Sequence, residues 1–380
     1  MPLLHKIAGI VVLCALVLGL AFQDHRPRHA HHASTAGSHD GMSAGRSPAS
    51  PAPASTPPSP PTPSGTPSSP GTPSATPTAG AVAPATPAAV QVKANELGQV
   101  PVFMYHRIMK HPEASLDRST KELYAELTRL ADSDYYPITA AEFASGRLDV
   151  PLGKHPVVLT FDDSTPGQFS LDARGGPAPD TAVAIIQQVA REHPGFRPVA
   201  TFYCNEDLFG LGPRAAEGLR WLMGNGFEVA NHTVTHPDLR TMGKSGVQKE
   251  IAGMEDKLFS LTGRHTTTFA YPFGSIPHNR VWAQREDGRY SFEIVFLAGW
   301  KPSESPFDKV FDRWAATRIR SEGKIRENDC RTFCSTAWLD WLDDHPRERY
   351  TSDGDPGTVT FPKTFEKRLA KQYRSYAREY

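Results

Sequence analysis

The stretch PVVLTFDD (residues 156–163) is a hydrophobic run that ends in two adjacent carboxylates, Asp162 and Asp163. An unbroken apolar run of this length predicts a strand that is buried on both faces. Adjacent residues at a strand end point in different directions, so the two carboxylates need not share one task. One can bind a metal ion while the other faces a water molecule as a base. The alternative interpretation is an ordinary turn, in which aspartate is common.

A second polar cluster follows a strand predicted over residues 227–231. It reads Asn231-His232-Thr233-Val234-Thr235-His236-Pro237 and places two imidazoles four residues apart. We expect this spacing to form one helical turn with both rings on the same side. No glutamate follows His232, so the helix signature of the zinc proteases is absent. The alternative is one buried structural histidine and one on the surface.

Together the two segments supply one carboxylate and two histidines for a divalent metal ion. Three protein ligands with one open coordination position are typical of a hydrolytic metal site. The second carboxylate then remains available as a base. The sequence therefore predicts a metal-dependent hydrolase.

Strand signals alternate with helix signals along the chain from Val100 to Arg320. The predicted strands cover 100–105, 156–161, 199–203, 227–231, 267–271, 293–298 and 315–320, and the predicted helices cover 119–132, 180–192, 214–224 and 247–261. Asp180 is expected to cap the second helix, and Gly263 is expected to end the fourth. Such alternation indicates a mostly parallel sheet that forms a closed or partly closed barrel. A basic amphipathic helix is predicted over 363–380.

The two polar motifs resemble those of the polysaccharide deacetylase family, carbohydrate esterase family 4, in order and spacing. The resemblance covers about residues 100–320 and implies an α/β fold, a distorted, incomplete (β/α) barrel. It implies removal of acetyl groups from polysaccharides with a bound divalent metal ion. By that match Asp162 is the general base, and Asp163, His232 and His236 bind the metal. Zn²⁺ is the first expectation, and Co²⁺ or Ni²⁺ can replace it.

The third motif of the family, Arg-x-Pro-Tyr/Phe-Gly, reads Ala270-Tyr271-Pro272-Phe273-Gly274 here. The match implies that the backbone N–H of Phe273 helps to stabilise the oxyanion. The arginine that usually pairs with the base is replaced by Ala270. Arg318 or Arg320, near the end of a later predicted strand, could take its place.

The last family motif, Leu-x-Leu-His, which normally brings the general acid, is absent. However, the segment PVFMYHR (residues 101–107) resembles the opening strand of the poly-N-acetylglucosamine deacetylase branch. In that branch the order of elements is permuted, and a histidine after the first strand can act as the acid. The resemblance makes His106 the candidate; the alternative is a structural histidine at a strand end. Ser164 also departs from the glycine that often follows the paired aspartates.

The resemblance implies hydrolysis of N-acetyl groups from an amino-sugar polysaccharide, such as peptidoglycan, a chitin-like polymer or poly-N-acetylglucosamine. Two alternatives stay open. One is an esterase that acts on an O-acetyl polysaccharide such as acetylxylan. The other is a carbohydrate-binding protein without activity, which Ala270 and the missing last motif motivate. The formal net charge is zero, so bulk electrostatics give no argument for a nucleic-acid partner. We expect a monomer.

The N-terminal quarter of the chain has the composition of a targeting segment and a spacer. Lys6 precedes an apolar run, so residues 1–22 are predicted to be a signal peptide or a membrane anchor, and the protein is expected to be exported to the cell surface or beyond. Residues 23–97 are rich in His and then in Pro, Ser, Thr and Ala, and we expect a disordered linker. Residues 98–380 are expected to form the catalytic domain.

The chain has four cysteines, which are too few for a disulfide scaffold. Cys330 and Cys334 are four residues apart and could form a local disulfide or remain free thiols. Cys204 is expected to be a small buried residue after the strand at 199–203.

Overall fold

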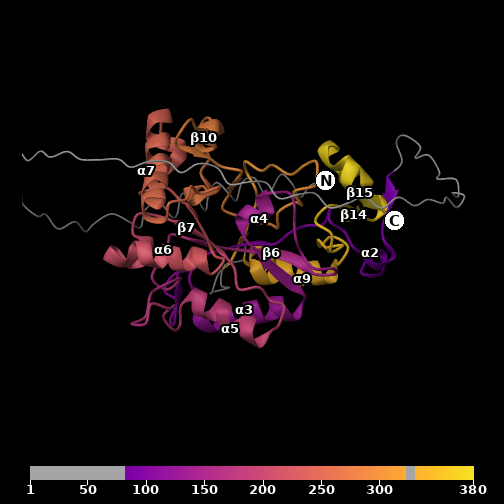
Figure 1. Cartoon of the computed structure of the whole chain (residues 1–380), viewed down its shortest axis with the longest axis horizontal. Coiled ribbons are helices and arrows are strands. Elements are labelled where there is room, and N and C mark those ends of the chain that lie inside the picture. Colours follow the sequence, from indigo (N-terminus) through magenta and orange to yellow (C-terminus); the bar gives the residue numbers. More distant parts are fainter. Residues whose placement is uncertain (1–81, 322–329) are drawn as a thin grey trace, which may run out of the picture. The chain divides into compact units, whose positions relative to one another are not determined.

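A computed structural model describes residues 82–321 and 330–380 (Figure 1). The predicted leader and most of the predicted linker lie outside the described residues. Within residues 82–321 and 330–380, no helix is both long enough and apolar enough to cross a membrane.

A curled sheet of eight parallel strands forms the centre of the fold. Seven of them follow one another across the sheet in the order β12 (Ile294–Phe296), β9 (Thr268–Ala270), β8 (Glu228–Asn231), β7 (Thr201–Cys204), β6 (His155–Asp162), β2 (Val102–Tyr105) and β13 (Ile319–Arg320). The eighth, β5 (Tyr135–Ile138), pairs with the first half of β6, while β7 pairs with its second half. The predicted α/β fold with an incomplete barrel is confirmed.

The two edges of this sheet are joined by the segment 316–320. Ala316 forms a parallel bridge to Phe296 of β12, and three residues later the chain becomes β13, which pairs with β2. The segment passes so close to Gly299 that a Cβ atom there would lie 1.3 Å from the carbonyl oxygen of Arg318. Only glycine therefore allows the two chain segments to approach in this way.

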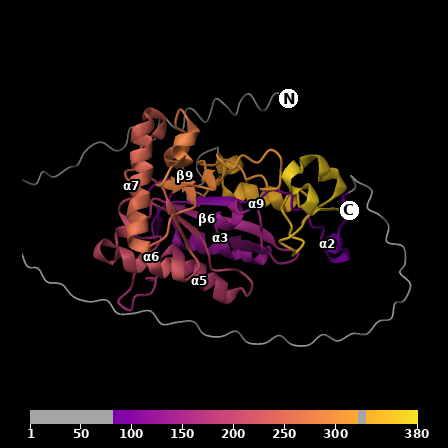
Figure 2. The same cartoon turned by 45° about the horizontal axis from the view of Figure 1, so that its top comes forward.

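Helices cover the outer face of the sheet. They are α3 (Thr120–Asp132), α5 (Ala182–Glu192), α6 (Ala215–Gly224), α7 (Lys244–Thr262) and α9 (Ser335–Asp344). Figure 1 shows α3 and α5 side by side, and Figure 2 shows α7 rising beside α6. One buried cluster joins α3, α5 and α6 to β2, β6 and β7, and a second joins α7 to β9 and β12.

The ends of these helices follow their local sequence. Ser119 and Glu122 form a capping box at the start of α3. Gly263, with φ 73°, ends α7 in the left-handed conformation, as predicted. Thr181, rather than the predicted Asp180, caps α5, because its side chain accepts the N–H of Ala184.

A third buried cluster fills the interior of the barrel from the amino-terminal ends of its strands. Side chains of β7, β8, β9 and β12 contact the short helix α4 (Ala140–Ala144) and the C-terminal part of the chain there. Phe307, Tyr350 and Phe361 belong to this cluster. The carboxyl ends of the strands remain as the face on which a site can form.

The C-terminal segment differs from its prediction. In place of one amphipathic helix it forms the 3₁₀ segments η7 (Lys363–Arg368) and η8 (Lys371–Tyr376) and the strand β15 (Ala377–Glu379). β15 pairs with both β1 (Ala83–Pro84) and β14 (Val359–Phe361). Tertiary pairing of the backbone thus overrides the helical spacing of the side chains.

The folded part also begins earlier than the predicted boundary at residue 98. β1 and the helix α2 (Pro87–Gln91) precede it, and Glu96 and Leu97 are buried. The Glu96 carboxylate accepts hydrogen bonds from the Tyr350 hydroxyl and from the backbone of Thr360. These contacts fix the end of the predicted linker to the C-terminal segment.

The cysteine alternatives are decided by the structure. Cys330 and Cys334 form a disulfide that joins α8 (Cys330–Phe333) to the start of α9. Cys204 is a buried free thiol at the end of β7, as expected.

The contact at Gly299 yields a stability prediction. Gly299→Ala should lower the free energy of unfolding by about 3 kcal/mol, because the added methyl group overlaps the backbone of the segment that joins the sheet edges. Urea denaturation measures the change. Gly224→Ala is the matched control, since a Cβ at this position in α6 meets no atom within 4 Å. Equal stability of the two variants would contradict the close contact between Gly299 and the backbone of Arg318.

Candidate active site

Loops at the carboxyl ends of four strands of this sheet bring the predicted residues together. His106 follows β2, Asp162 ends β6, His232 follows β8, and Phe273 lies beyond β9. Because parallel strands place their carboxyl ends at one edge, residues distant in the sequence become neighbours there.

Asp163, His232 and His236 have the geometry of a metal-binding triad. The Nε2 atoms of His232 and His236 lie 3.6 Å and 3.5 Å from Oδ1 of Asp163, and the ligand atoms all lie within 4.8 Å of one another. The Nδ1–H of His232 donates to the carbonyl of Ala270 at 2.8 Å, which leaves the Nε2 lone pair directed at the cluster. The donor set and its orientation fit a divalent cation.

The two histidines do not lie on a helical turn, so that part of the prediction is wrong. Thr233 and His236 have φ values of 69° and 55°, in the left-handed region. The Asn231 side chain accepts the N–H of Thr233, and the Thr233 hydroxyl accepts the N–H of His236. This hydrogen-bonded loop nevertheless brings the imidazole rings to 4.9 Å from each other, on the same side as predicted.

Left-handed backbone is concentrated at this site. Five residues of the site loops have positive φ although none is glycine: Asp163, Ser164, Thr233, His236 and Phe273. Each costs on the order of 1 kcal/mol or more and persists only where its surroundings determine it. One such restraint is the hydrogen bond from the Ser275 hydroxyl to Asp238, which joins the turn that contains Phe273 to the loop that follows His236.

A buried ion pair holds Asp162. The guanidinium of Arg318 donates to Oδ1 and Oδ2 of Asp162, both at 2.7 Å, and both side chains are almost fully buried. Burial alone would raise the pKa of Asp162, but Arg318 and His232 together hold it well below its usual range. The structure therefore selects Arg318 over Arg320 as the partner of this carboxylate.

Gln168 joins two parts of the site and was missed in the sequence analysis. Its side-chain amide is fully buried and donates to the carbonyls of His106 at 2.9 Å and Asp162 at 2.5 Å. It thus fixes the ends of β2 and β6 relative to each other. A lone glutamine six residues after Asp162 carries no recognisable signal in the sequence.

His106 and Phe273 lie near the triad. A positive charge on His106 lowers the pKa of both Asp162 and His236, so its imidazole lies close to both groups. Its Nδ1 atom is buried and has no hydrogen-bond partner among the described residues. The ring of Phe273 is 57% exposed, and its centroid lies 4.4 Å from that of His236.

The protonation states suit a metal site. Burial and the neighbouring His232 lower the pKa of His236 to about 4, so its imidazole is neutral at ordinary pH. A neutral imidazole and an ionised carboxylate are the forms that bind metal ions.

The model of the family described as polysaccharide deacetylase matches residues 149–291, which contain Asp162, the triad and Phe273. Residues 149–291 of this chain are thus similar to the polysaccharide deacetylase family. His106 and Arg318 lie outside these matched residues. His106 directly follows β2, and Arg318 directly precedes β13, the strand that pairs with β2.

Two curated proteins match parts of this chain. A chitooligosaccharide deacetylase from Sinorhizobium fredii is 31% identical over 132 residues, which are 34% of this chain and 47% of that protein. An uncharacterised 30.6 kDa protein from Geobacillus stearothermophilus is 28% identical over 109 residues, 28% of this chain and 39% of that protein. The chain thus spans less than half of the length of these two relatives.

Two solved structures are also similar to this chain. The deacetylase PplD of Streptococcus pyogenes, in complex with acetate, is 20% identical with a TM-score of 0.48, and the match covers 62% of this chain and 98% of that chain. IcaB from Ammonifex degensii is 20% identical with a TM-score of 0.44, and the match covers 58% of this chain and 91% of that chain.

The Asp162–Arg318 pair yields a second prediction. Arg318→Met should lower the free energy of unfolding by about 3–5 kcal/mol, because it leaves a buried carboxylate without its partner. Arg318→Lys should recover part of the loss, since a lysine keeps the charge but cannot form the two parallel hydrogen bonds. Urea denaturation at neutral pH measures both.

Arg280→Met is the matched control, because the Arg280–Asp312 pair is about half exposed and contributes at most about 1 kcal/mol. In the double variant Arg318→Met/Asp162→Asn, part of the stability should return. A double variant no more stable than Arg318→Met would contradict the assigned pairing.

Proposed function

We propose that this protein hydrolyses N-acetyl groups of an amino-sugar polysaccharide and releases acetate, with a divalent metal ion held by Asp163, His232 and His236. One observation carries the proposal: three metal-binding side chains converge within 4.8 Å beside a buried, arginine-paired carboxylate. The match to the polysaccharide deacetylase model supports the substrate class. The chitooligosaccharide deacetylase among the relatives supports an acetylated amino sugar.

Asp162 is the general base in this proposal. When bound, a divalent cation, with Zn²⁺ the first expectation for one carboxylate and two imidazoles, would polarise the acetyl carbonyl and lower the pKa of a water molecule. Oδ2 of Asp162 lies 3.9 Å from Nε2 of His232, so this carboxylate reaches the same space. Because Arg318 keeps it ionised, Asp162 can accept the proton of the water as the water oxygen attacks the carbonyl carbon.

Phe273 and His106 act on the two groups that gain electrons. The C=O electron pair moves onto the carbonyl oxygen, and the N–H of Phe273 donates a hydrogen bond to it. When the C–N bond breaks, its electron pair stays on the sugar nitrogen, which takes a proton from His106. The products are acetate and a free amine on the sugar.

The arginine contact favours an enzyme over an inactive carbohydrate-binding protein. That alternative depends on the loss of the motif arginine at Ala270. Arg318 provides the same charge to Asp162 from another strand, with both guanidinium contacts at 2.7 Å. The base therefore keeps its cationic partner, and one of the two reasons to expect inactivity is removed, the other being the missing last motif.

We also propose that the protein works outside the cytoplasm as a monomer. The apolar N-terminal run and the Pro-rich stretch after it support export and a spacer that separates the domain from a membrane. A wall or matrix glycan is the corresponding substrate.

Acetate release from a small panel of glycans tests the proposed activity. N-acetylglucosamine oligomers, peptidoglycan and acetylxylan are each incubated with the full chain, with and without a chelator. We expect acetate from at least one N-acetylated glycan, loss of activity with chelator, and recovery with Zn²⁺, Co²⁺ or Ni²⁺. Activity on acetylxylan alone would indicate an esterase, and glycan binding without any acetate release would indicate a binding protein.

Four substitutions separate the base from the metal ligands. Asp163→Ala, His232→Ala and His236→Ala should each lower the bound metal content. Asp162→Asn should keep the metal but lower kcat by about 10²–10⁴-fold, because the amide cannot take a proton. Metal content by atomic emission and kcat on an N-acetylated oligomer measure the two effects.

Asp287→Asn, at an exposed carboxylate in another loop, is the control and should change neither quantity. If Asp162→Asn stays active, or if it loses its metal as the triad variants do, the assigned division of roles is wrong.

A further inference from the structure

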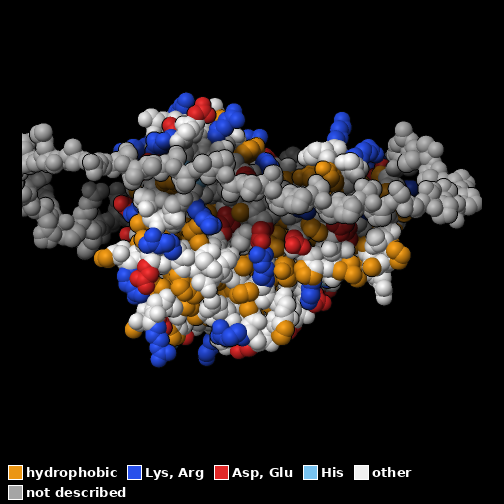
Figure 3. Space-filling model, in the orientation of Figure 1, with side chains coloured by type: hydrophobic (Ala, Val, Ile, Leu, Met, Phe, Trp, Pro, Cys, Tyr) orange, Lys and Arg blue, Asp and Glu red, His pale blue; other side chains and the backbone are white. Residues whose placement is uncertain are grey.

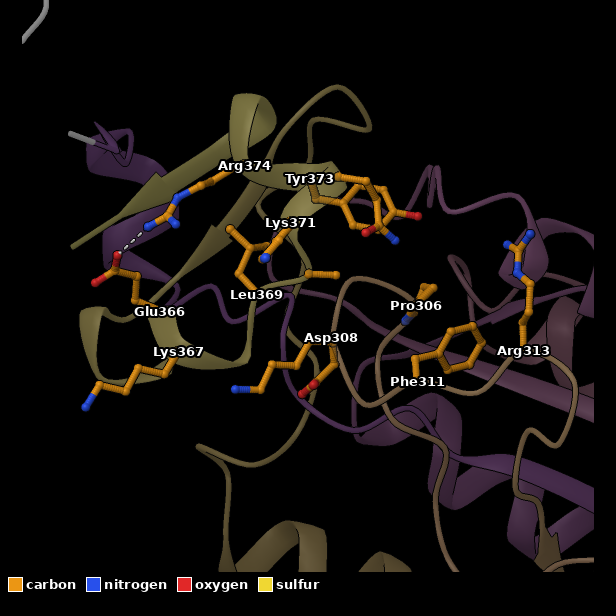
Figure 4. A pocket seen from close by; sticks show the side chains of 13 residues that line it. Pro306, Asp308, Phe311, Arg313, Glu366, Lys367, Leu369, Lys371, Tyr373 and Arg374 are labelled. Atoms are coloured by element: carbon orange, nitrogen blue, oxygen red, sulfur yellow. Dashed lines mark hydrogen bonds and ion pairs between the residues drawn. The ribbon is translucent and has the colours of Figure 1, made fainter. Parts of the chain in front are cut away.

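A groove lies at the opposite end of the barrel from the candidate active site. The segment 306–313 and the C-terminal residues 366–374 line it, with a cavity volume of about 980 Å³, and no residue of the candidate site is among them (Figure 4). The backbone carbonyl of Arg313 accepts the N–H of Val295 in β12, and the chain then runs parallel to the strands until Arg318 reaches Asp162. The groove therefore lies at the start of the segment 313–318, and this segment runs from the groove to the end of the barrel that carries the candidate active site.

The two sides of the groove are fixed to each other by the backbone. Asp308 and Leu369 form an antiparallel bridge, and the N–H of Lys309 donates to the carbonyl of Arg368 at 2.7 Å. The Arg368 side chain also donates to the Asp308 carboxylate at 2.6 Å. These contacts make the floor rigid, so a ligand would meet a surface that is already formed.

The charges that line the groove are unbalanced. Five lining residues are cationic, and the two carboxylates, Asp308 and Glu366, are already paired with Arg368 and Arg374. Three exposed lysines have no ion-pair partner among the described residues, and we call them the groove lysines: Lys309, Lys367 and Lys371. An anionic ligand is the complement that this surface lacks.

Two aromatic side chains add apolar wall surface. Tyr373 packs edge-on against Phe307, with ring centroids 5.0 Å apart, and Phe311 packs edge-on against Phe143 of α4 at 5.7 Å. Both rings are only half-buried, so part of each faces the groove. Aromatic rings that the core holds in place can pack against the C–H faces of sugar rings.

The cations are spread along the groove rather than gathered at one point. In Figure 4, Arg313 lies beyond Phe311 at one end of the groove, and Lys367 and Arg374 lie at the other end. Lys371 lies between the two ends. Figure 3 shows lysine and arginine side chains on the outer surface near the C-terminal segment as well. Spaced cations match a chain with repeated negative charges better than a single small anion.

We propose that this groove binds an anionic polysaccharide, one whose sugar units carry carboxylate or phosphate groups. The groove is a binding site separate from the candidate active site. It holds a charged glycan at the amino-terminal end of the barrel, while acetyl groups are hydrolysed at the carboxyl end.

Binding of charged and neutral polymers to the full chain tests the proposal. Isothermal titration is carried out with polygalacturonate for carboxylates, poly(glycerol phosphate) for phosphates and dextran as the neutral polymer. We expect at least one charged polymer to bind, dextran not to bind, and the affinity to fall as salt increases because exposed charges are screened. The carboxylate and phosphate arms identify the anionic group.

Substitution of the groove lysines locates the binding. In the variant Lys309→Gln/Lys367→Gln/Lys371→Gln the Kd for the charged polymer should rise about tenfold, since exposed charges each contribute a fraction of the binding energy. The matched control is Lys121→Gln/Lys244→Gln/Lys249→Gln, three exposed lysines on α3 and α7, whose Kd should stay within about twofold of the wild type.

Three outcomes would overturn the proposal: binding of neither charged polymer, an equal effect of the two triple variants, or binding to DNA or anionic lipid vesicles in preference to both polymers. Catalysis is measured separately on a short, uncharged N-acetylglucosamine oligomer, and the groove variant should keep its wild-type rate. The Asp162→Asn variant should still bind the charged polymer. A failure of the groove is therefore distinguishable from a failure of the proposed hydrolysis.

Discussion

The ion pair between Arg318 and Asp162 is the interaction on which the rest of the site depends. A carboxylate at the centre of a barrel is stable in its ionised form only when a partner replaces the lost water. Arg318 reaches it from the segment that joins the two sheet edges, and its guanidinium lies 5.6 Å from the ring centre of Tyr203. The same residue thus belongs both to the closure of the sheet and to the electrostatics of the site. A change that disturbs the closure of the sheet therefore also disturbs the electrostatics of the site.

In the proposed mechanism, this pair determines how Asp162 would act as a base. A carboxylate whose pKa lies below its usual range holds a proton weakly, so it accepts one only from an acidic donor and returns it readily. The neighbouring triad is arranged for the complementary task. Asp163 is held at positive φ, and the pKa of His236 is lowered to about 4, so the imidazole of His236 is in its neutral, metal-binding form. The two adjacent aspartates differ in their surroundings, because Asp162 is the one that Arg318 pairs with, and this difference fits the proposed division of roles.

Much of this arrangement was predictable from the sequence, and the part that was not depends on register. Asp162 and His232 were expected to meet because each follows a strand of one parallel sheet. The choice between Arg318 and Arg320 was open, because it depends on which residue bridges β12 and which pairs with β2. The loop from His232 to His236 was predicted as a helical turn, since spacing alone does not reveal left-handed residues. The predicted C-terminal helix is wrong because a tertiary contact overrides the spacing of the side chains. The N–H of Ala370 donates to the carbonyl of Phe307, far away in the sequence, so the chain leaves the helical path there.

The position of Arg318 also indicates how much of the chain the proposed deacetylase chemistry would need. The matched residues 149–291 contain the triad, Asp162 and Phe273, but they leave Asp162 without its arginine and without His106. Both missing groups come with β2 and β13, which pair with each other, and β2 in turn pairs with β6. Ala270 is fully buried and carries no charge, so the cation beside Asp162 comes from Arg318 in the joining segment. Asp162 needs a cation beside it, whichever strand that cation comes from. The segment 316–320 can supply Arg318 because it joins the two edges of the sheet next to the site.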